Sequence, residues 1–236
     1  MNPEPSLILA TAATIAVVHT ALGPDHYLPF VAMAKARRWG AVKTASVTAL
    51  CGLGHAMGSV LLGLIGVSTG VAVAKLEWFE SSRGELAAWA LIALGLVYLA
   101  WGLKRARRRH AHSHLHAHAD GTVHAHAHSH DRDHVHVHDA PGNATLVPWS
   151  LFLIFILGPC EPMIPLMMAP MAAGDVFGLI AVVTTYTAVT LATMLAIVFA
   201  ALKGLRFAAG GVARYGHALA GGVVAMCGFA MAFLGL

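Results

Sequence analysis

Charged side chains are scarce in this chain. Of its 236 residues, 11% are charged and 58% are hydrophobic, whereas a soluble globular domain carries about 25% charged residues. This deficit excludes an ordinary soluble domain and indicates an integral membrane protein that has the lipid bilayer around it. The 15 basic residues stand in short clusters between apolar segments. They are therefore interpreted as markers of membrane topology, and nucleic acid is not expected as a partner.

Cysteine is also rare. The three cysteines, Cys51, Cys160 and Cys227, lie in apolar segments, and none of them forms a C-x-x-C pair. This pattern supports neither a disulfide framework nor a zinc finger. The first residues, MNPEPSLILA, lack the basic stretch of a cleaved signal peptide, so we expect the first apolar segment to be retained.

Six apolar segments are long enough to be transmembrane helices, because a helix needs about 20 mostly apolar residues to cross the hydrocarbon. Backbone polar groups in lipid must be satisfied internally, which requires these segments to be helical. The predicted fold class is therefore all-α, a polytopic membrane protein with six transmembrane helices. The predicted spans cover residues 6–34, 44–73, 86–103, 146–173, 175–202 and 211–235.

Basic residues lie mostly on one side of the predicted bilayer. The connections after the first, third and fifth spans hold 13 of the 15 Lys and Arg residues, and only Lys75 and Arg83 fall on the other side. The positive-inside rule assigns the richer side to the cytoplasm. We therefore expect a bacterial inner (plasma) membrane protein with both termini outside.

An internal repeat relates the two halves of the chain. LGPDHYLPFVAMA in the first half resembles LGPCEPMIPLMMA in the second, and a polar pair follows Leu-Gly-Pro in both copies, Asp25-His26 and Cys160-Glu161. Each copy lies in the first span of a three-span half, so the halves are predicted to have opposite orientations. Many secondary transporters have such inverted repeats, with broken helices around the substrate. Two ordinary proline kinks are the alternative interpretation.

Ionisable side chains within the predicted spans are the main functional signal. Each costs about 2.5–3.5 kcal/mol or more at the bilayer centre and therefore needs a partner. The mixture of imidazole, carboxylate and thiol groups suits Ni²⁺, Co²⁺ or Zn²⁺, and it does not suit Mg²⁺ or Ca²⁺. The predicted metal ligands are Asp25, His26 and Glu161 at the centre of the site, with Cys160, His19 and His55 in support.

Two features of these spans have structural alternatives. His55 lies in a glycine-rich segment in which Gly54 and Gly58 form a G-x-x-x-G packing face. It therefore either binds metal or hydrogen-bonds across that helix interface. Four threonines recur at every third position of the fifth span, where they either line the path or bond to their own helix carbonyls. They are Thr184, Thr187, Thr190 and Thr193.

Histidine is concentrated between the third and fourth spans. Residues 110–138 hold 12 of the 16 histidines, mostly as His-x-His, and their composition provides no hydrophobic core, so we expect a disordered cytoplasmic loop over residues 104–145. Neutral imidazoles bind transition metals, so the tract predicts several weak sites that concentrate metal near the pore. An incidental solvated linker is the alternative. The predicted loop ligands are His110, His112, His114, His116, His118, His124, His126, His128, His130, His134, His136 and His138.

At HTALGPDH the chain resembles the nickel/cobalt transporter superfamily, which includes the urease-accessory UreH-type membrane proteins. That family has a His-x4-Asp-His motif in an early helix, and its members often carry histidine-rich loops. The resemblance implies that His19, Asp25 and His26 bind metal in the translocation path, and that His55 of LGHAMGS belongs to the same site. It also implies metalloenzyme-maturation proteins as partners. Here the spacing is His-x5-Asp-His, so the prediction depends mainly on Asp25 and His26.

The second half of the chain has a different resemblance. LGPCEPMIP is similar to the Gly-Pro-Cys element of the membrane thiol-electron carriers of cytochrome c biogenesis and of TauE/SafE-type exporters. A thiol carrier needs two cysteines that exchange disulfides. The repeat places Asp25, and not a cysteine, opposite Cys160. Cys51 could be the second thiol only if the fold brings it next to Cys160. A transmembrane thiol-disulfide carrier is therefore the alternative function. An assembly factor that binds metal without moving it is a third.

The predicted function is that of a metal permease without enzymatic activity and without a cofactor. Two inverted three-helix repeats, residues 1–103 and 146–236, flank the histidine-rich loop. A homo-oligomer is compatible with this pattern. We expect the protein to move divalent transition-metal ions, nickel or cobalt before zinc, with proton coupling through Glu161, His26 or both.

Overall fold

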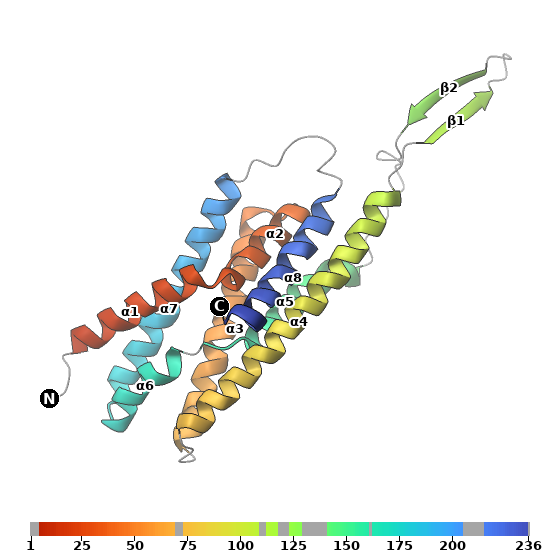
Figure 1. The fold of residues 1–236 in the computed structure, drawn as a ribbon. Coiled ribbons are helices and arrows are strands. Elements are labelled where there is room, and N and C mark those ends of the chain that lie inside the picture. Colours follow the sequence, from red (N-terminus) through yellow and green to blue (C-terminus); the bar gives the residue numbers. More distant parts are fainter. Residues whose placement is uncertain are drawn as a thin grey trace.

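A computed structural model describes residues 5–68, 73–108, 112–117, 123–128, 141–160, 162–204 and 215–235. Over these residues the chain is helical apart from one two-stranded hairpin (Figure 1). The elements are α1 (Pro5–Leu22), the 3-10 turn η1 (Pro24–His26), α2 (Leu28–Ala36), α3 (Ala41–Ser68), α4 (Val73–Arg108), β1 (His112–Ala117), β2 (Val123–His128), α5 (Pro141–Leu157), α6 (Met163–Ala172), α7 (Val176–Gly204) and α8 (Gly216–Leu234).

Several of these helices fit a multi-pass membrane protein. Among the described residues, α3, α4, α7 and α8 each contain a segment long and apolar enough to cross a membrane, which makes four candidate spans. α1 and the η1–α2 segment form a fifth candidate as a pair, but they are bent by 85° at the break between them. α5 and α6, which the sequence analysis joins in one span, are two separate and shorter apolar helices.

Both Leu-Gly-Pro sequences interrupt a helix. α1 ends at Leu22 and α5 ends at Leu157, directly before the two Gly-Pro pairs. Proline has no N–H group to continue the helical hydrogen bonds, and its ring clashes with the preceding turn. The chain then forms η1 in the first copy and resumes as α6 from Met163 in the second. The two breaks predicted from the repeat are therefore present.

α4 is the element that differs most from its prediction. The sequence analysis limits this span to residues 86–103, but the helix runs from Val73 to Arg108. The prediction ends the span where charged residues begin, but Arg83 pairs with Glu80 one turn earlier on the same helix, at 2.8 Å between Nη1 and Oε1. Because residues three apart are neighbours on a helix, these charges are compatible with a continuous helix.

α4 packs along α8 with the two backbones in direct contact. A Cβ atom built at Gly95 would collide with the backbone of Ala225, and one built at Gly221 would collide with the backbone of Leu99. Small residues let membrane helices approach closely, so that they gain van der Waals contact where lipid removes the hydrophobic driving force. This glycine-lined seam fixes the position of the longest helix.

The remaining helices enclose two apolar clusters. The larger cluster contains Phe30 of α2 and Leu151 of α5, and the other contains Cys160, Met163 of α6 and Tyr186 of α7. Many large apolar side chains also point outwards, including residues that are more than half exposed on α4 and α8. An apolar exterior of this kind is expected where lipid surrounds the helices.

The hairpin lies within the histidine tract, which the sequence analysis expects to be disordered. The structure differs over β1 and β2, which pair antiparallel with His112 opposite His128 and His116 opposite His124. The physical reason is the His-x-His alternation, because its period of two is also the side-chain period of a strand. The hairpin follows α4 in the chain and projects from the bundle (Figure 1).

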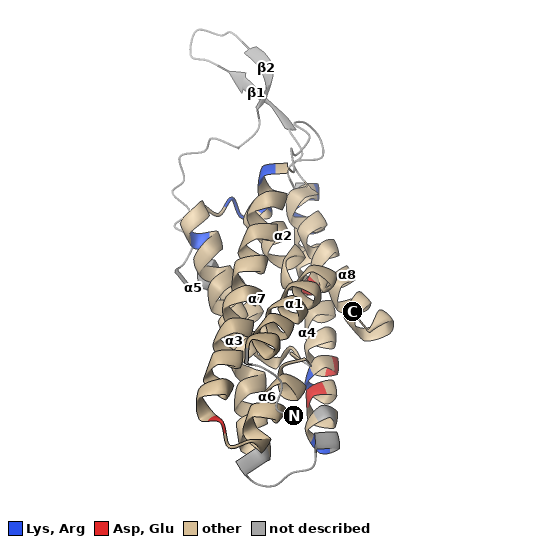
Figure 2. Cartoon of the chain, turned by 90° about the vertical axis from the view of Figure 1, so that its left-hand side faces the viewer, with Lys and Arg blue, Asp and Glu red and all other residues tan. Residues whose placement is uncertain are grey.

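Charge is distributed unequally along the bundle. Among the described residues, Lys and Arg lie mostly at the end from which the hairpin projects, whereas Asp and Glu lie mostly away from it (Figure 2). This asymmetry agrees with the distribution of basic residues along the sequence.

Candidate metal centre

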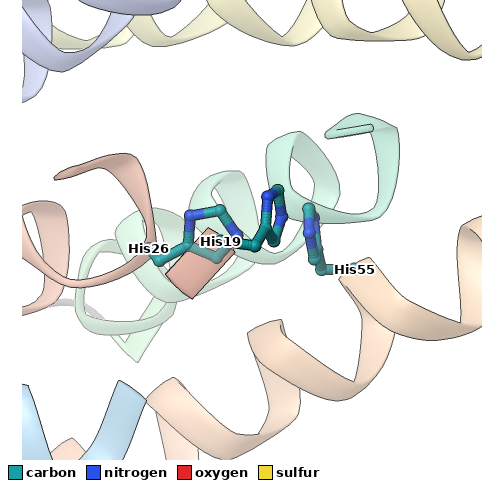
Figure 3. Close-up of side chains that lie close together, drawn as sticks. All are labelled: His19, His26 and His55. Atoms are coloured by element: carbon teal, nitrogen blue, oxygen red, sulfur yellow. The ribbon is translucent and has the colours of Figure 1, made fainter. Parts of the chain in front are cut away.

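Three histidines from separate elements converge on one point inside the bundle. His19 lies near the end of α1, His26 lies in η1 and His55 lies in α3. One ring nitrogen from each lies within 4.8 Å of the others, and the ring centroids of His26 are 4.8 Å from those of His19 and 5.0 Å from those of His55. Figure 3 shows the three rings gathered together. This spacing is compatible with one ion bound by all three.

The break after α1 brings His19 and His26 together. The Gly23 N–H donates to the His19 carbonyl at 3.0 Å, and the His26 N–H donates to the Gly23 carbonyl at 3.1 Å. A Cβ atom at Gly23 would lie 2.5 Å from His26 Nδ1 and 2.8 Å from Asp25 Oδ1. Only glycine leaves room for this turn beneath the two side chains.

The histidines present the same unpaired nitrogen to the site. Nε2 of His19, His26 and His55 is buried and has no hydrogen-bond partner. His26 Nδ1 lies 3.1 Å from Asp25 Oδ1, and His55 hydrogen-bonds to the backbone of Phe155. Such acceptors hold the proton on Nδ1 and leave the Nε2 lone pair available. An unpaired buried polar atom costs about 1–3 kcal/mol, so three of them in one place favour a ligand that accepts nitrogen lone pairs.

Asp25 contacts His26 at Nδ1, the ring nitrogen other than the unpaired Nε2. It is buried, with 8% of its surface exposed, and its carboxylate contacts the ring nitrogen opposite the unpaired one. Metal-binding histidines commonly donate their second N–H to a carboxylate, which fixes the ring and strengthens the ligand. The arrangement therefore gives Asp25 an orienting position, outside the group of three that the ring nitrogens form.

The second Leu-Gly-Pro break also borders the site. A Cβ atom at Gly158 would lie 3.0 Å from His55 Nδ1. A small cavity opens between Asp25, His55 and Gly158, and it is otherwise lined by apolar side chains of α4, α5 and α8. Both breaks predicted from the sequence repeat therefore meet at the histidine group, each with its glycine against an imidazole.

Cys160 lies beside a different part of α3. Its backbone N–H donates to Ser59 Oγ at 3.1 Å, and its Sγ donates to the Tyr186 hydroxyl at 3.5 Å. The side chain is fully buried, and all three cysteines of the chain are free thiols. Cys160 is not among the three residues that converge, and Glu161, the other predicted ligand of this segment, lies outside the described residues.

Several buried threonine hydroxyls also lack a hydrogen-bond partner. Thr187 and Thr190 of α7, two of the four threonines noted in the sequence, have buried Oγ1 atoms without a hydrogen-bond partner. Thr20 and Thr48 share this property and were missed by the sequence analysis. The sequence could have indicated them by position. Thr20 directly follows His19, and Thr48 lies seven residues before His55, two helical turns along the same face.

Six predicted loop ligands lie in the hairpin. The register pairs His112 with His128, His114 with His126 and His116 with His124. Because alternate positions of a strand share a face, these six positions belong to one face of the hairpin. The other predicted loop ligands, His110, His118, His130, His134, His136 and His138, lie outside the described residues.

Arg83 is another residue whose position near the site is not predicted from the sequence. The predicted topology assigns Arg83 to an outer connection, but the residue lies inside α4, and its Nη2 donates to the carbonyls of Ile156 and Gly158. Its partner Glu80 is buried as well. The signal in the sequence is a pair of opposite charges three residues apart, flanked by apolar helix.

Comparison of the chain with family models, curated proteins and solved structures found no match. A functional assignment therefore depends on the geometry of the histidine group and on the sequence pattern.

Proposed function

We propose that this chain is a membrane permease for divalent transition-metal ions, with nickel or cobalt as the preferred substrate and zinc as an alternative. The observation that carries the proposal is the convergence of His19, His26 and His55, each with a buried and unpaired Nε2. Imidazole is a borderline ligand that suits these metals. No enzymatic step is part of the proposal.

The number of ligands favours transit over permanent binding. Structural zinc sites are closed by four protein ligands, whereas sites with three keep a position open for exchange. Three histidines, with a small cavity beside Asp25 and His55, provide such an open position. An ion held in this way can enter and leave without the protein unfolding.

Charge compensation is the second requirement for an ion inside a membrane. Three neutral imidazoles contribute no charge, so a divalent ion brings two positive charges into apolar surroundings, where unpaired charge is costly. The Asp25 carboxylate next to His26 offsets one of them. We assign the second to Glu161, and we propose that Glu161, His26 or both exchange protons as metal moves. Cys160 supports the site from the α5–α6 break.

The proposed architecture is a pair of inverted three-helix repeats with six transmembrane helices. In this arrangement α1 with α2, and α5 with α6, each form one broken span, as in transporters whose helices are interrupted at the substrate. The resemblance of HTALGPDH to the nickel/cobalt transporter superfamily supports the same assignment. The excess of Lys and Arg at one end supports a bacterial inner membrane protein with both termini outside and the hairpin in the cytoplasm.

The hairpin is proposed to buffer metal beside the bundle. Its register sets three histidine positions directly opposite three others, and local ligands raise the effective concentration of an ion at a tethered site. Metalloenzyme-maturation proteins are the proposed cytoplasmic partners, and a homo-oligomer is compatible with the arrangement.

The decisive experiment is metal flux in proteoliposomes. We expect saturable transport of Ni²⁺ or Co²⁺, no transport of Mg²⁺, and at least about a tenfold loss in His26→Ala and His19→Ala, by analogy with losses at metal-ligand partners. Asp25→Ala should also reduce flux, and Cys160→Ser should have a smaller effect. His217→Ala is the matched control, because His217 contacts Tyr98 in a separate cluster.

Other outcomes would redirect the assignment. Metal binding without flux would indicate an assembly factor. Loss of activity in Cys160→Ser alone, together with a trapped mixed disulfide, would indicate the thiol carrier.

A further inference from the structure

Arg83 connects α4 to the broken end of α5. Its Nη2 donates to the Ile156 carbonyl at 2.7 Å and to the Gly158 carbonyl at 3.3 Å, while its Nη1 donates to Glu80 at 2.8 Å. The side chain is 20% exposed, and that of Glu80 is 2% exposed. One guanidinium group therefore joins two helices that are distant in sequence.

The end of α5 needs an external donor. The last carbonyls of a helix have no partner within the helix, and Pro159 has no N–H to offer them. In lipid an unsatisfied carbonyl is unfavourable because no water is present to hydrogen-bond it. A cation at a helix C-terminus is also favoured by the helix dipole. Arg83 meets both needs at the Ile156 and Gly158 carbonyls.

The turn that Arg83 holds is the turn that positions His55. The Phe155 carbonyl accepts the hydrogen bond of His55, and Gly158 packs directly against His55 Nδ1. Phe155 directly precedes Ile156, and Gly158 is itself one of the two residues whose carbonyls Arg83 binds. Displacement of this turn would therefore move the acceptor that fixes the His55 ring.

The surroundings of Arg83 leave little freedom for it to move. A Cβ atom at Gly58 would lie 2.5 Å from Arg83 Nη2 and 2.8 Å from the Ile156 carbonyl oxygen. Gly58 lies on α3 three residues after His55. The guanidinium group therefore contacts the same helix face that carries the histidine.

We propose that Arg83 is a positioning residue for the metal centre, which keeps the unpaired nitrogen of His55 directed towards His19 and His26 by holding the last turn of α5. This inference rests on the proposed function, since it concerns the same three-histidine site. Glu80 neutralises Arg83 and fixes the direction of its guanidinium group. Arg83 and Glu80 touch none of the three histidines in this role and act through the α5 backbone.

The test is a Co²⁺ titration of the purified full-length protein, read by visible absorption. The histidines of residues 110–138 are replaced by serine in every sample, so that the membrane site is observed alone. We expect Arg83→Met to weaken Co²⁺ binding about 10–100-fold, as loss of a supporting partner does at other metal sites, and to change the d–d bands. Arg83→Lys should recover part of the affinity, because one ammonium group can still reach a carbonyl. Glu80→Gln should give an intermediate loss.

Tyr98→Phe is the matched control. It removes a hydroxyl that contacts Arg37 and His217, fifteen residues further along α4, or about 22 Å at the helical rise. We expect a lower melting temperature in this variant, with unchanged Co²⁺ affinity and spectrum.

The outcomes separate the two proposals. If the parent protein binds no Co²⁺, the proposed function fails and the inference fails with it. If the parent binds and Arg83→Met lowers only the melting temperature, with affinity and bands unchanged, Arg83 is merely structural and the inference is wrong. Should Arg83→Met not fold, Arg83→Lys and Glu80→Gln decide by the same criterion, and an unchanged spectrum and affinity in both overturns the inference.

Discussion

At the scale of single residues, Gly23 matters to the site as much as the histidines beside it. A methyl group added at Gly23 would lie 2.5 Å from His26 Nδ1, the ring nitrogen that Asp25 contacts, and 2.8 Å from Asp25 Oδ1. The proline that follows fixes the backbone of the turn. The turn therefore cannot accommodate a larger residue at position 23 without displacing the His26 ring or the Asp25 carboxylate.

We expect Gly23→Ala to weaken Co²⁺ binding about tenfold or more, the size of effect seen when a supporting partner of a metal ligand is lost. The measurement is a Co²⁺ titration of the full-length protein with its tract histidines replaced. Gly40→Ala is the control, because nothing lies within 4 Å of a Cβ atom at Gly40. Equal affinity in the two variants would contradict the assigned role of Gly23.

The residues of the proposed metal centre differ in how well the sequence predicts them. Asp25 and His26 follow a helix breaker in lipid, which is a strong local signal. The signal for His19 in the sequence is weaker, because its spacing to Asp25 is one residue longer than in the nickel/cobalt transporter superfamily, yet the bend after Leu22 brings it to His26. Sequence spacing describes a continuous helix, and a bend of 85° changes which residues meet.

The role of His55 also cannot be predicted from the sequence alone. The sequence left open whether it binds metal or hydrogen-bonds across a helix interface. It contacts Phe155 across the interface with one nitrogen and leaves Nε2 unpaired with the other. The two alternatives are therefore compatible, which only the position of the second helix could reveal.

At the scale of elements, the α4–α8 seam depends on the absence of side chains. Gly221 meets the backbone of Leu99, whereas its neighbour Gly222 has nothing within 4 Å of a Cβ atom. These adjacent glycines therefore provide an internal comparison within one helix turn.

We expect Gly221→Ala to destabilise the protein by about 1–3 kcal/mol, the usual cost of overpacking. Gly222→Ala should be neutral or slightly stabilising, because alanine favours the helix more than glycine does. Thermal melting of the two detergent-solubilised variants provides the measurement. A similar melting temperature for both would show that the helices separate without cost at the seam.

Element boundaries were predicted less well than element types. Hydropathy locates the apolar parts of α3, α7 and α8, because lipid imposes length and composition on them. It fails at the ends of α4, where Glu80 and Arg83 satisfy each other, and in the histidine tract, where alternation produced β1 and β2. In both cases pairing between residues, which composition does not record, decides the structure.

At the scale of the whole molecule, filling the site should stabilise the fold. A ligand that binds only the native state adds RT ln(1 + [L]/Kd), about 2.7 kcal/mol at one hundred times Kd. We therefore expect Co²⁺ or Ni²⁺ to raise the melting temperature of the protein whose tract histidines are replaced, and Mg²⁺ to leave it unchanged. The triple variant His19→Ala, His26→Ala, His55→Ala should lose the response. An equal shift in that variant would locate the binding elsewhere.

The arrangement of spans is the part of the molecule that the sequence describes least completely. Length and composition indicate four or five candidate spans among the described residues, because two of the predicted spans are broken into shorter helices. The repeat predicted both breaks correctly, since a Gly-Pro pair acts on the backbone locally. How the halves are related depends on contacts between distant segments.

The three histidines and Asp25 all belong to the first half of the chain, while the described residues of the second half that border this group, Phe155 and Gly158, contribute backbone. The proposed charge partner Glu161 also belongs to the second half. The two halves are thus alike in the shape of their breaks and unlike in their chemistry. In a transport cycle that alternates between two orientations, exchanging the halves does not exchange the ligands, so the end states differ in free energy. We expect transport by such a carrier to be asymmetric, with a lower half-saturating metal concentration on one face of the membrane than on the other.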